Sequence, residues 1–209
     1  MKIILIEQAA TAMHWEAAYD STGFSRALEQ ELACGIKAAQ RSRSSAAGYT
    51  VYTAATCAAR QTAELLFELP TPPVETPLLD DVLLRPFRDT EKKLPLRLWQ
   101  SMGKLQWASG NGRKAESRGE TLRRAGELVD QIEAVGRDCV LISRGLTMRA
   151  LKSVLRRRGY LLEGGDLRPV PLERVRATKR DLHCGGCAHN CLLSEAKCQT
   201  GKNKALGIR

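Results

Sequence analysis

The residues best suited to chemistry lie near the C-terminal end of the chain. Four cysteines within 15 residues follow the spacing C-x2-C-x3-C-x6-C, at Cys184, Cys187, Cys191 and Cys198. Thiolates so closely spaced among glycines and small polar residues can turn inward on one metal centre. The spacing therefore predicts a metal or cluster site, in preference to a redox-active or incidental group of thiols.

The identity of the metal is left between two possibilities. Iron–sulfur clusters favour thiolates gathered in one short run, which indicates a [4Fe–4S] cluster. Zn2+ is the alternative, although structural zinc sites more often join two separated C-x2-C pairs. His183 and His189 lie inside the same stretch and could replace a cysteine as ligand or hydrogen-bond to one.

A second group of chemically capable residues follows three predicted strands. The segments are 7–11, 53–56 and 143–147. In an open parallel sheet, ligands bind beyond the carboxyl ends of the strands. Arg144 also precedes a predicted helix, where free backbone N–H groups and the helix dipole favour an anion.

Apolar patterning supplies the elements that position these residues. Continuous apolar runs predict buried strands at 2–6, 49–53 and 139–142, and helical periodicity predicts helices at 24–36, 56–69, 120–135 and 146–158. This alternation predicts an α/β three-layer sandwich, with a mostly parallel sheet covered by helices on both faces. We expect a surface loop at 103–119, one α/β domain over 1–178, and a small irregular Cys-rich tail over 179–209.

Composition excludes several classes of protein. The chain has 209 residues, is 43% hydrophobic and contains no apolar run near the roughly 18 residues of a membrane span. Seven cysteines is an odd number, so we expect a reducing cytoplasmic location rather than a disulfide framework. Cys34, Cys57 and Cys139 are isolated in apolar segments, and we expect them in the core.

The formal net charge of +10 is concentrated in the last third of the chain. Residues 1–143 contain 18 basic and 18 acidic side chains, whereas residues 144–209 contain 15 and 5. Nucleic acid is nevertheless a disfavoured partner, because no aromatic residue follows Tyr160 to stack on bases. A protein partner at the tail is the preferred expectation.

Three stretches of the sequence resemble the histidine phosphatase superfamily, whose fold is phosphoglycerate-mutase-like. They are residues 51–66, the Gly-Glu-Thr at 119–121, and Val-Leu-Ile-Ser-Arg-Gly-Leu-Thr-Met-Arg-Ala-Leu at 140–151. The resemblance extends from Met1 to about Val175. It implies that fold and a phosphorylated small molecule as a ligand.

The catalytic positions depart from that family. Where the family has Arg-His-Gly-Glu-Thr after its first strand, this chain has Glu7, Gln8, two alanines and Thr11. The family's second phosphate-binding Arg falls on Ala58 and its second His on Arg144, while Asp81 lies at or next to its acidic residue. A phosphohistidine mechanism needs a nucleophilic imidazole, which these positions lack.

We therefore expect a catalytically inactive pseudo-phosphatase with a regulatory, sensing or scaffolding role through its tail. One alternative is a phosphatase or mutase that acts on a small phosphorylated substrate with Asp81 and Arg144. Another is a redox accessory protein. We also predict that Glu7 and Arg144 form an ion pair that closes the old pocket, the simpler possibility being two solvated charges at a loop rim.

Overall fold

The computed structural model describes residues 1–110, 116–164 and 171–179. These residues form a six-stranded sheet in the order β6-β4-β8-β1-β10-β9. The strands β6, β4, β8 and β1 pair in parallel, and β10 is antiparallel to both of its neighbours. Their bounds are Lys2–Glu7 (β1), Thr50–Thr53 (β4), Val74–Glu75 (β6), Cys139–Ser143 (β8), Tyr160–Glu163 (β9) and Arg174–Lys179 (β10).

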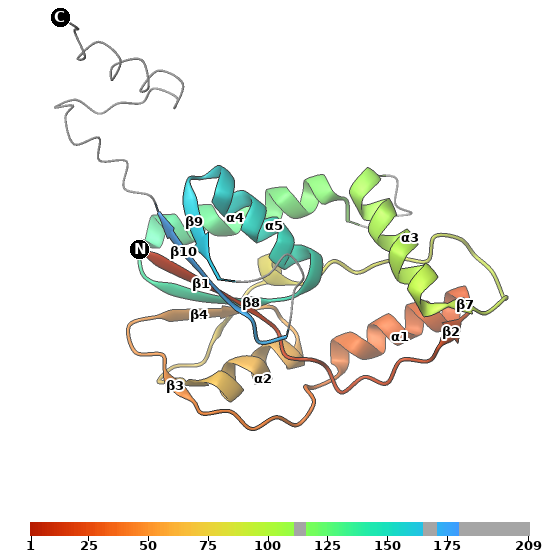
Figure 1. Ribbon diagram of the computed structural model, residues 1–209, viewed down its shortest axis with the longest axis horizontal. Helices are drawn as coiled ribbons and strands as arrows, with labels where there is room; N and C mark the ends of the chain where they lie inside the picture. The colour runs from red at the N-terminus through yellow and green to blue at the C-terminus, as the bar shows by residue number, and fades with distance from the viewer. Residues whose placement is uncertain (111–115, 165–170, 180–209) are drawn as a thin grey trace, which may run out of the picture.

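Helices cover both faces of this sheet (Figure 1). The helix α2 (Cys57–Leu66) lies on one face, and α4 (Arg118–Val135) and α5 (Gly145–Arg157) pack together on the other. The continuous apolar runs of β1 and β8 lie at the centre of the core between the layers. Every residue of β8 is buried. The predicted α/β three-layer sandwich with a mostly parallel sheet is therefore confirmed.

A smaller lobe lies beyond the C-terminal ends of β1 and β8 (Figure 1). It contains α1 (Ser21–Ala33), α3 (Leu96–Ser109) and a two-stranded ribbon of β2 (Ala18–Tyr19) and β7 (Leu94–Pro95). Trp99 is fully buried in this lobe, stacks on Phe24 with ring centroids 5.3 Å apart, and donates from Nε1 to the Tyr19 carbonyl at 2.9 Å. This second apolar core fixes α1 and α3 next to the sheet edge.

Short elements complete the chain. The 3-10 turn η1 (Pro77–Leu79) follows β6, and a small parallel ribbon joins β3 (Ser44–Ser45) to β5 (Phe67–Glu68). Side-chain caps set the starts of three helices: Asp20 caps α1, Thr56 caps α2, and Ser117 with Glu120 forms a capping box on α4. Arg156 and Arg157 lie in the last turn of α5, as expected for charges that oppose the helix dipole.

Two expectations about local structure were wrong, and two strands were missed. The predicted loop 103–119 is wrong for residues 103–109 and 118–119, which are helical, because Trp99 buries α3 and Trp107 Nε1 hydrogen-bonds to Thr121 Oγ1 at 2.9 Å; residues 111–115 lie outside the described residues. The predicted helix 56–69 ends at Leu66, where the chain enters β5. The last two strands, β9 and β10, were not predicted, because their apolar positions alternate or are too few to form a continuous run.

The isolated cysteines are not all in the core. Cys139 is buried, and burial raises the pKa of its thiol to about 12. Cys34 is half-buried at the end of α1, whereas Cys57 is exposed at the start of α2, so the core expectation is wrong for Cys57. The helical register turns Cys57 to solvent while Ala58 and Ala59 face the sheet.

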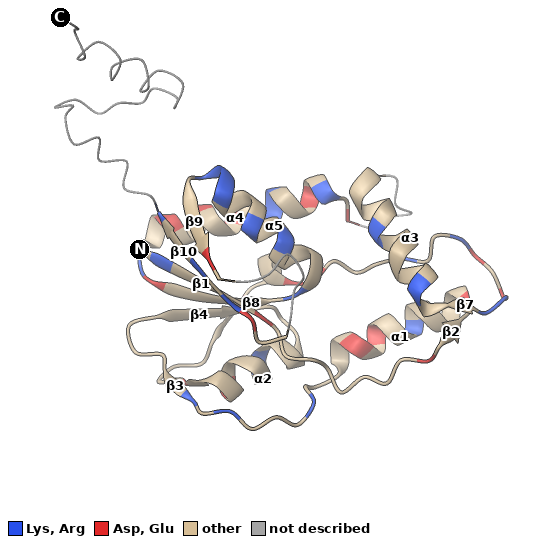
Figure 2. Cartoon of the chain, viewed as in Figure 1, with Lys and Arg blue, Asp and Glu red and all other residues tan. Residues whose placement is uncertain are grey.

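Charge is distributed unevenly over the described elements. Figure 2 shows acidic segments on α1 and basic segments on α5 and β10.

No helix in the described part of the chain is long and apolar enough to cross a membrane. The predicted cysteine site, with Cys184, Cys187, Cys191, Cys198, His183 and His189, lies outside the described residues, as does most of the predicted tail.

Candidate functional site

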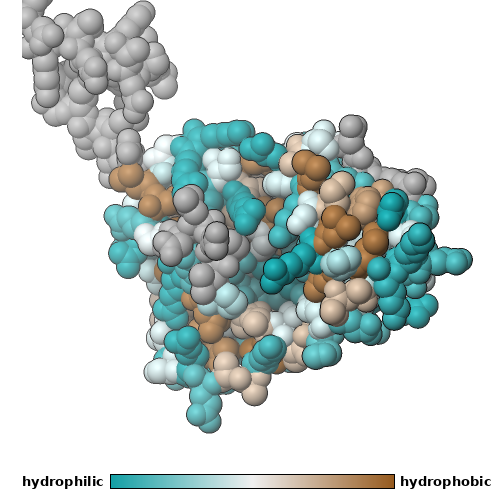
Figure 3. Space-filling model, turned by 45° about the vertical axis from the view of Figure 1, so that its right-hand side comes forward, coloured by the Kyte–Doolittle hydropathy of each residue, from teal (hydrophilic) through white to brown (hydrophobic). Residues whose placement is uncertain are grey.

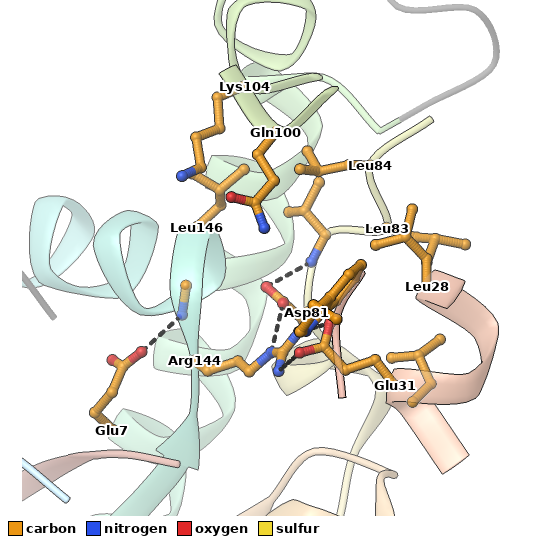
Figure 4. Close-up of a pocket in the computed structure, with 14 residues that line it drawn as sticks. Glu7, Leu28, Glu31, Asp81, Leu83, Leu84, Gln100, Lys104, Arg144 and Leu146 are labelled. Carbon is orange, nitrogen blue, oxygen red and sulfur yellow. Dashed lines mark hydrogen bonds and ion pairs between the residues drawn. The ribbon is translucent and has the colours of Figure 1, made fainter. Parts of the chain in front are cut away.

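A cavity of about 270 Å³ lies between the C-terminal ends of the central strands and the smaller lobe. Figure 4 shows its polar floor, formed by Glu7, Glu31, Asp81 and Arg144, with side chains of α3 above it. In the space-filling view of Figure 3, hydrophobic residues lie next to hydrophilic ones on the side of the molecule where α3 lies. The rest of the lining is Trp15, Leu28, Leu32, Val82, Leu83, Leu84, Gln100, Lys104, Gly145 and Leu146.

Arg144 is the centre of the floor. Its Nη1 and Nη2 donate to Glu31 Oε1 and Oε2 at 2.8 and 2.7 Å, and its Nε donates to Asp81 Oδ2 at 2.9 Å. The bidentate geometry with Glu31 is the strongest pairing that a guanidinium makes. Burial alone would lower the pKa of Arg144, but its hydrogen bonds to Glu31 and its charge interaction with Asp81 raise it above its usual value. Arg144 is therefore a fully ionised group already neutralised by two internal carboxylates.

The predicted ion pair between Glu7 and Arg144 is wrong. Glu7 instead accepts a hydrogen bond at Oε1 from the backbone N–H of Gly145, 2.9 Å away, at the start of α5. The parallel register places Glu7 directly beside Ser143, which brings its carboxylate to this helix terminus. The longer side chain of Arg144 extends toward α1 and Glu31 (Figure 4). The N-terminus expected to attract an external anion thus holds an internal one.

Gly145 makes this arrangement possible. Its φ of +60° is in the left-handed region, which glycine adopts without the steric cost that a side chain incurs. A Cβ at this position would lie 3.0 Å from Asp81 Oδ1. The absence of a side chain therefore lets the carboxylate of Asp81 approach the turn between β8 and α5.

Glu7 is in an unfavourable environment for a charge. Its side chain is only 8% exposed, and its Oε2 has no hydrogen-bond partner among the described residues. Burial raises the pKa of Glu7 from 4.5 to about 7, and the hydrogen bond from Gly145 and the nearby charge of Lys152 offset only part of that effect. Glu7 therefore changes its protonation near neutral pH.

Asp81 is held by the loop that follows η1. Arg124 on α4 donates from Nη1 to the carbonyls of Pro77, Leu78 and Asp80 at 2.8–3.0 Å, which fixes the loop from the opposite side. Asp81 Oδ1 accepts from the Val82 N–H at 2.9 Å. Burial raises the pKa of Asp81, while the charge of Arg144 opposes that shift.

The remaining residues of the predicted pocket lie behind Arg144. Gln8 is buried and accepts from Thr56 Oγ1 at 3.4 Å, and Ala58 is 1% exposed in the first turn of α2. They border a void of only about 10 Å³, at most the space of one water molecule. Thr11 lies at the edge of the cluster and donates to Glu31 Oε1 at 3.5 Å.

The structure thus brings most of the predicted pocket residues close together, but they line two separate spaces and not one pocket. The Arg144–Glu31–Asp81 cluster separates the void at Gln8 and Ala58 from the larger cavity bordered by Glu7. None of the residues that line either space is a histidine, and the exposed His14 lies outside both. Within the described ranges, no three His, Cys, Asp or Glu side chains are placed to hold a metal ion.

Sequence reasoning missed three residues of this site. Glu31 interrupts the apolar stripe of α1 between Leu28 and Leu32, which was the available signal for a buried charge needing a partner. Gln100 and Lys104 lie one turn apart on α3, in a segment of which the latter half was predicted to be a loop. Their contribution to the cavity depends on the burial of Trp99, which fixes the orientation of that helix.

Comparisons with known proteins give limited similarity. No family model matches the chain, and no curated protein matches its sequence. Among solved structures, Mycobacterial hydrolase 2 is 14% identical with a TM-score of 0.46, covering 74% of this chain and 71% of that one. A mycobacterial glucosyl-3-phosphoglycerate phosphatase in complexes with VO3 is 16% identical with a TM-score of 0.45, covering 74% and 81%. A phosphoserine phosphatase mutant from Entamoeba histolytica, in complex with phosphoserine, is 13% identical with a TM-score of 0.41, covering 75% and 80%.

Proposed function

We propose that the chain is a non-catalytic binding protein, a pseudo-phosphatase in which the strand-end pocket no longer performs phosphoryl transfer. Its role is regulatory, sensing or scaffolding, with the Cys-rich tail as a second, metal-bearing element. The proposal combines the sequence resemblance with the contacts of the pocket floor.

One observation carries the proposal: the groups that could receive a phosphate are already occupied by carboxylates of the chain itself. Arg144 is paired with Glu31 and Asp81, and the N–H of Gly145 is paired with Glu7. A phosphate entering here would have to displace the partly buried carboxylates of Glu31 and Asp81 and would meet the repulsion of ionised Glu7. The floor also offers no imidazole to accept a phosphoryl group.

Phosphate release from small phosphomonoesters tests this proposal. We expect the purified full-length chain to release no phosphate above buffer from 4-nitrophenyl phosphate, phosphoserine or 3-phosphoglycerate. The matched variants are Asp81→Asn and Arg144→Met, with Glu29→Gln on the exposed side of α1 as the control. Turnover by the wild type that Asp81→Asn or Arg144→Met abolishes, and Glu29→Gln preserves, would overturn the proposal. Such a result would favour the alternative phosphatase or mutase with a rearranged site.

The proposal assigns the tail cysteines to a [4Fe–4S] cluster, with Zn2+ as the alternative metal. The support is the spacing of Cys184, Cys187, Cys191 and Cys198. A net charge of about −2 on four thiolates around either centre would offset part of the local positive charge.

Anaerobic purification with metal analysis tests the tail. We expect about one equivalent of a four-iron cluster, or of zinc, per chain, and its loss when Cys187 and Cys191 are both changed to Ser. Cys57→Ser is the matched control because Cys57 is exposed and distant in sequence. Metal-free protein, or metal retained by the double variant, would contradict the assignment. A brown protein that dithionite bleaches reversibly would favour the redox accessory alternative.

A further inference from the structure

The cavity has two kinds of polar side chain in its lining. Those of the floor are paired with one another, because Arg144 binds Glu31 and Asp81 while Glu7 binds the N–H of Gly145. Gln100 and Lys104 differ, since neither makes a hydrogen bond or ion pair within the described part of the chain. The unpaired atom of the floor, Glu7 Oε2, is an acceptor when ionised and does not suit an anion, so the unpaired groups that can receive an anionic ligand are the amide and the ammonium on α3.

These two groups share one face of α3. Residues at i and i+4 of a helix are neighbours on its surface, and both side chains point from α3 toward Leu146 (Figure 4). The backbone of α3 comes close to the cavity wall because Gly103 has no side chain, and a Cβ there would lie 3.2 Å from Leu84 Cβ. An ammonium beside an amide N–H₂ matches the two oxygens of a carboxylate.

The walls between α3 and the floor are apolar. Half of the fourteen lining residues are leucine, valine or tryptophan. They are contributed by α1, α5, the segment 82–84 and Trp15. A cavity of about 270 Å³ is smaller than the typical site for a drug-sized ligand, which begins at roughly 300 Å³. It suits a short apolar chain or a single ring.

The floor determines how far an anionic head group can enter. Glu7, Glu31 and Asp81 provide three carboxyl groups against the single guanidinium of Arg144. An anion placed at the floor would be repelled, whereas one held at the mouth by Lys104 would not displace any internal pair.

We propose that this cavity binds a small monocarboxylate with an apolar body, whose carboxylate contacts Lys104 and Gln100 and whose body lies among Leu28, Leu84 and Leu146. The inference rests on the proposed function in one respect, that the pocket floor does not hold phosphate. It gives the binding protein a ligand class, a short-chain fatty or aryl acid, with the head group at the mouth rather than at the strand ends.

Calorimetric titration of the full-length chain with hexanoate tests this inference. We expect saturable binding of hexanoate. The affinities for octanoate and butanoate should differ from that for hexanoate by up to about fourfold for each methylene that the walls can cover. Hexanol and hexylammonium should bind more weakly than hexanoate, because neither carries a negative charge that can pair with the ammonium of Lys104.

Three variants locate the binding. Lys104→Met should weaken hexanoate binding about fivefold, which is the upper value for an exposed ion pair, and leave hexanol binding unchanged. Leu84→Ala should reduce the dependence on chain length. Lys92→Met removes an exposed lysine that does not line the cavity and should leave every affinity unchanged.

Several outcomes would overturn the inference. These are hexylammonium binding as tightly as hexanoate, no saturable carboxylate binding, or hexanoate binding that Lys104→Met does not alter. Each is distinguishable from failure of the proposed function, which would appear as phosphomonoester turnover sensitive to Asp81 and Arg144.

Discussion

Replacing Arg144 by Met is expected to lower the free energy of unfolding by about 3 kcal/mol at neutral pH. The substitution leaves the carboxylates of Glu31 and Asp81, whose side chains are only 12% and 18% exposed, without their common cation. Removing one member of such a partly buried group costs more than the group contributes as a whole, because the remaining charges are poorly solvated and lack a cation. Urea unfolding followed by tryptophan fluorescence measures the change.

Two further variants separate this effect from the loss of an ordinary ion pair. Arg60→Met removes the partner of Glu75 at the surface, where the two side chains are 53% and 38% exposed, and should cost less than about 1 kcal/mol. The triple variant Arg144→Met, Glu31→Gln, Asp81→Asn removes all three charges and should recover most of the lost stability. If Arg144→Met costs no more than Arg60→Met, the cluster of Arg144, Glu31 and Asp81 does not stabilise the folded protein.

The second large effect is a pH dependence of stability that originates in Glu7. The pKa of Glu7 is about 7 in the folded chain and about 4.5 when unfolded, because burial disfavours the charged form. Between these values the folded state retains a proton that the unfolded state has lost, so stability falls as the pH rises. Relative to Glu7→Gln, wild type should lose about 2 to 3 kcal/mol between pH 5 and pH 8.

The neighbours of Glu7 make this comparison specific. The N–H of Gly145 and the charges of Lys152 and Arg144 favour its ionised form, and Asp81 disfavours it. Burial raises the pKa of Asp81 as well, but Asp81 is present in both proteins, so its own desolvation contributes to both stability profiles. Glu29→Gln, an exposed change on α1, should give a stability profile parallel to wild type. Parallel profiles for wild type and Glu7→Gln would show that Glu7 titrates alike in the folded and unfolded states.

The sequence was sufficient to predict the layers of the fold. The apolar runs of β1 and β8 and the periodicity of α4 and α5 are local signals, and they require a sheet covered on both faces. The strand β10 was missed because its buried residues, Val175 and Ala177, alternate with arginines and so form no continuous apolar run. The helix α3 was not predicted, because the glycines and charges around Gly103 conceal a helix that one buried Trp holds in place.

The candidate site was predictable in its position but not in its pairing. Strand order and the rule for parallel sheets bring residues 7, 81 and 144 to one edge. The partner of Arg144 is Glu31, 113 residues away in the sequence, in a lobe whose placement depends on the second apolar core. From the strand ends alone, Arg144 was therefore predicted to pair with Glu7. The hydrogen bond that Glu7 accepts from the backbone N–H of Gly145 was not predicted. Such long-range pairing follows from tertiary packing, which residue spacing does not specify.

Glu7, an internal carboxylate, occupies the start of α5, the kind of helix terminus at which a phosphate binds. The amide resonance of Gly145 in a ¹H–¹⁵N spectrum reports this contact directly, because its N–H donates to Glu7. We expect this resonance to move with a midpoint near pH 7 in wild type, to lose that titration in Glu7→Gln, and to remain unchanged on addition of millimolar phosphate. A Gly145 resonance that shifts saturably with phosphate, and does not respond to Glu7, would contradict the account.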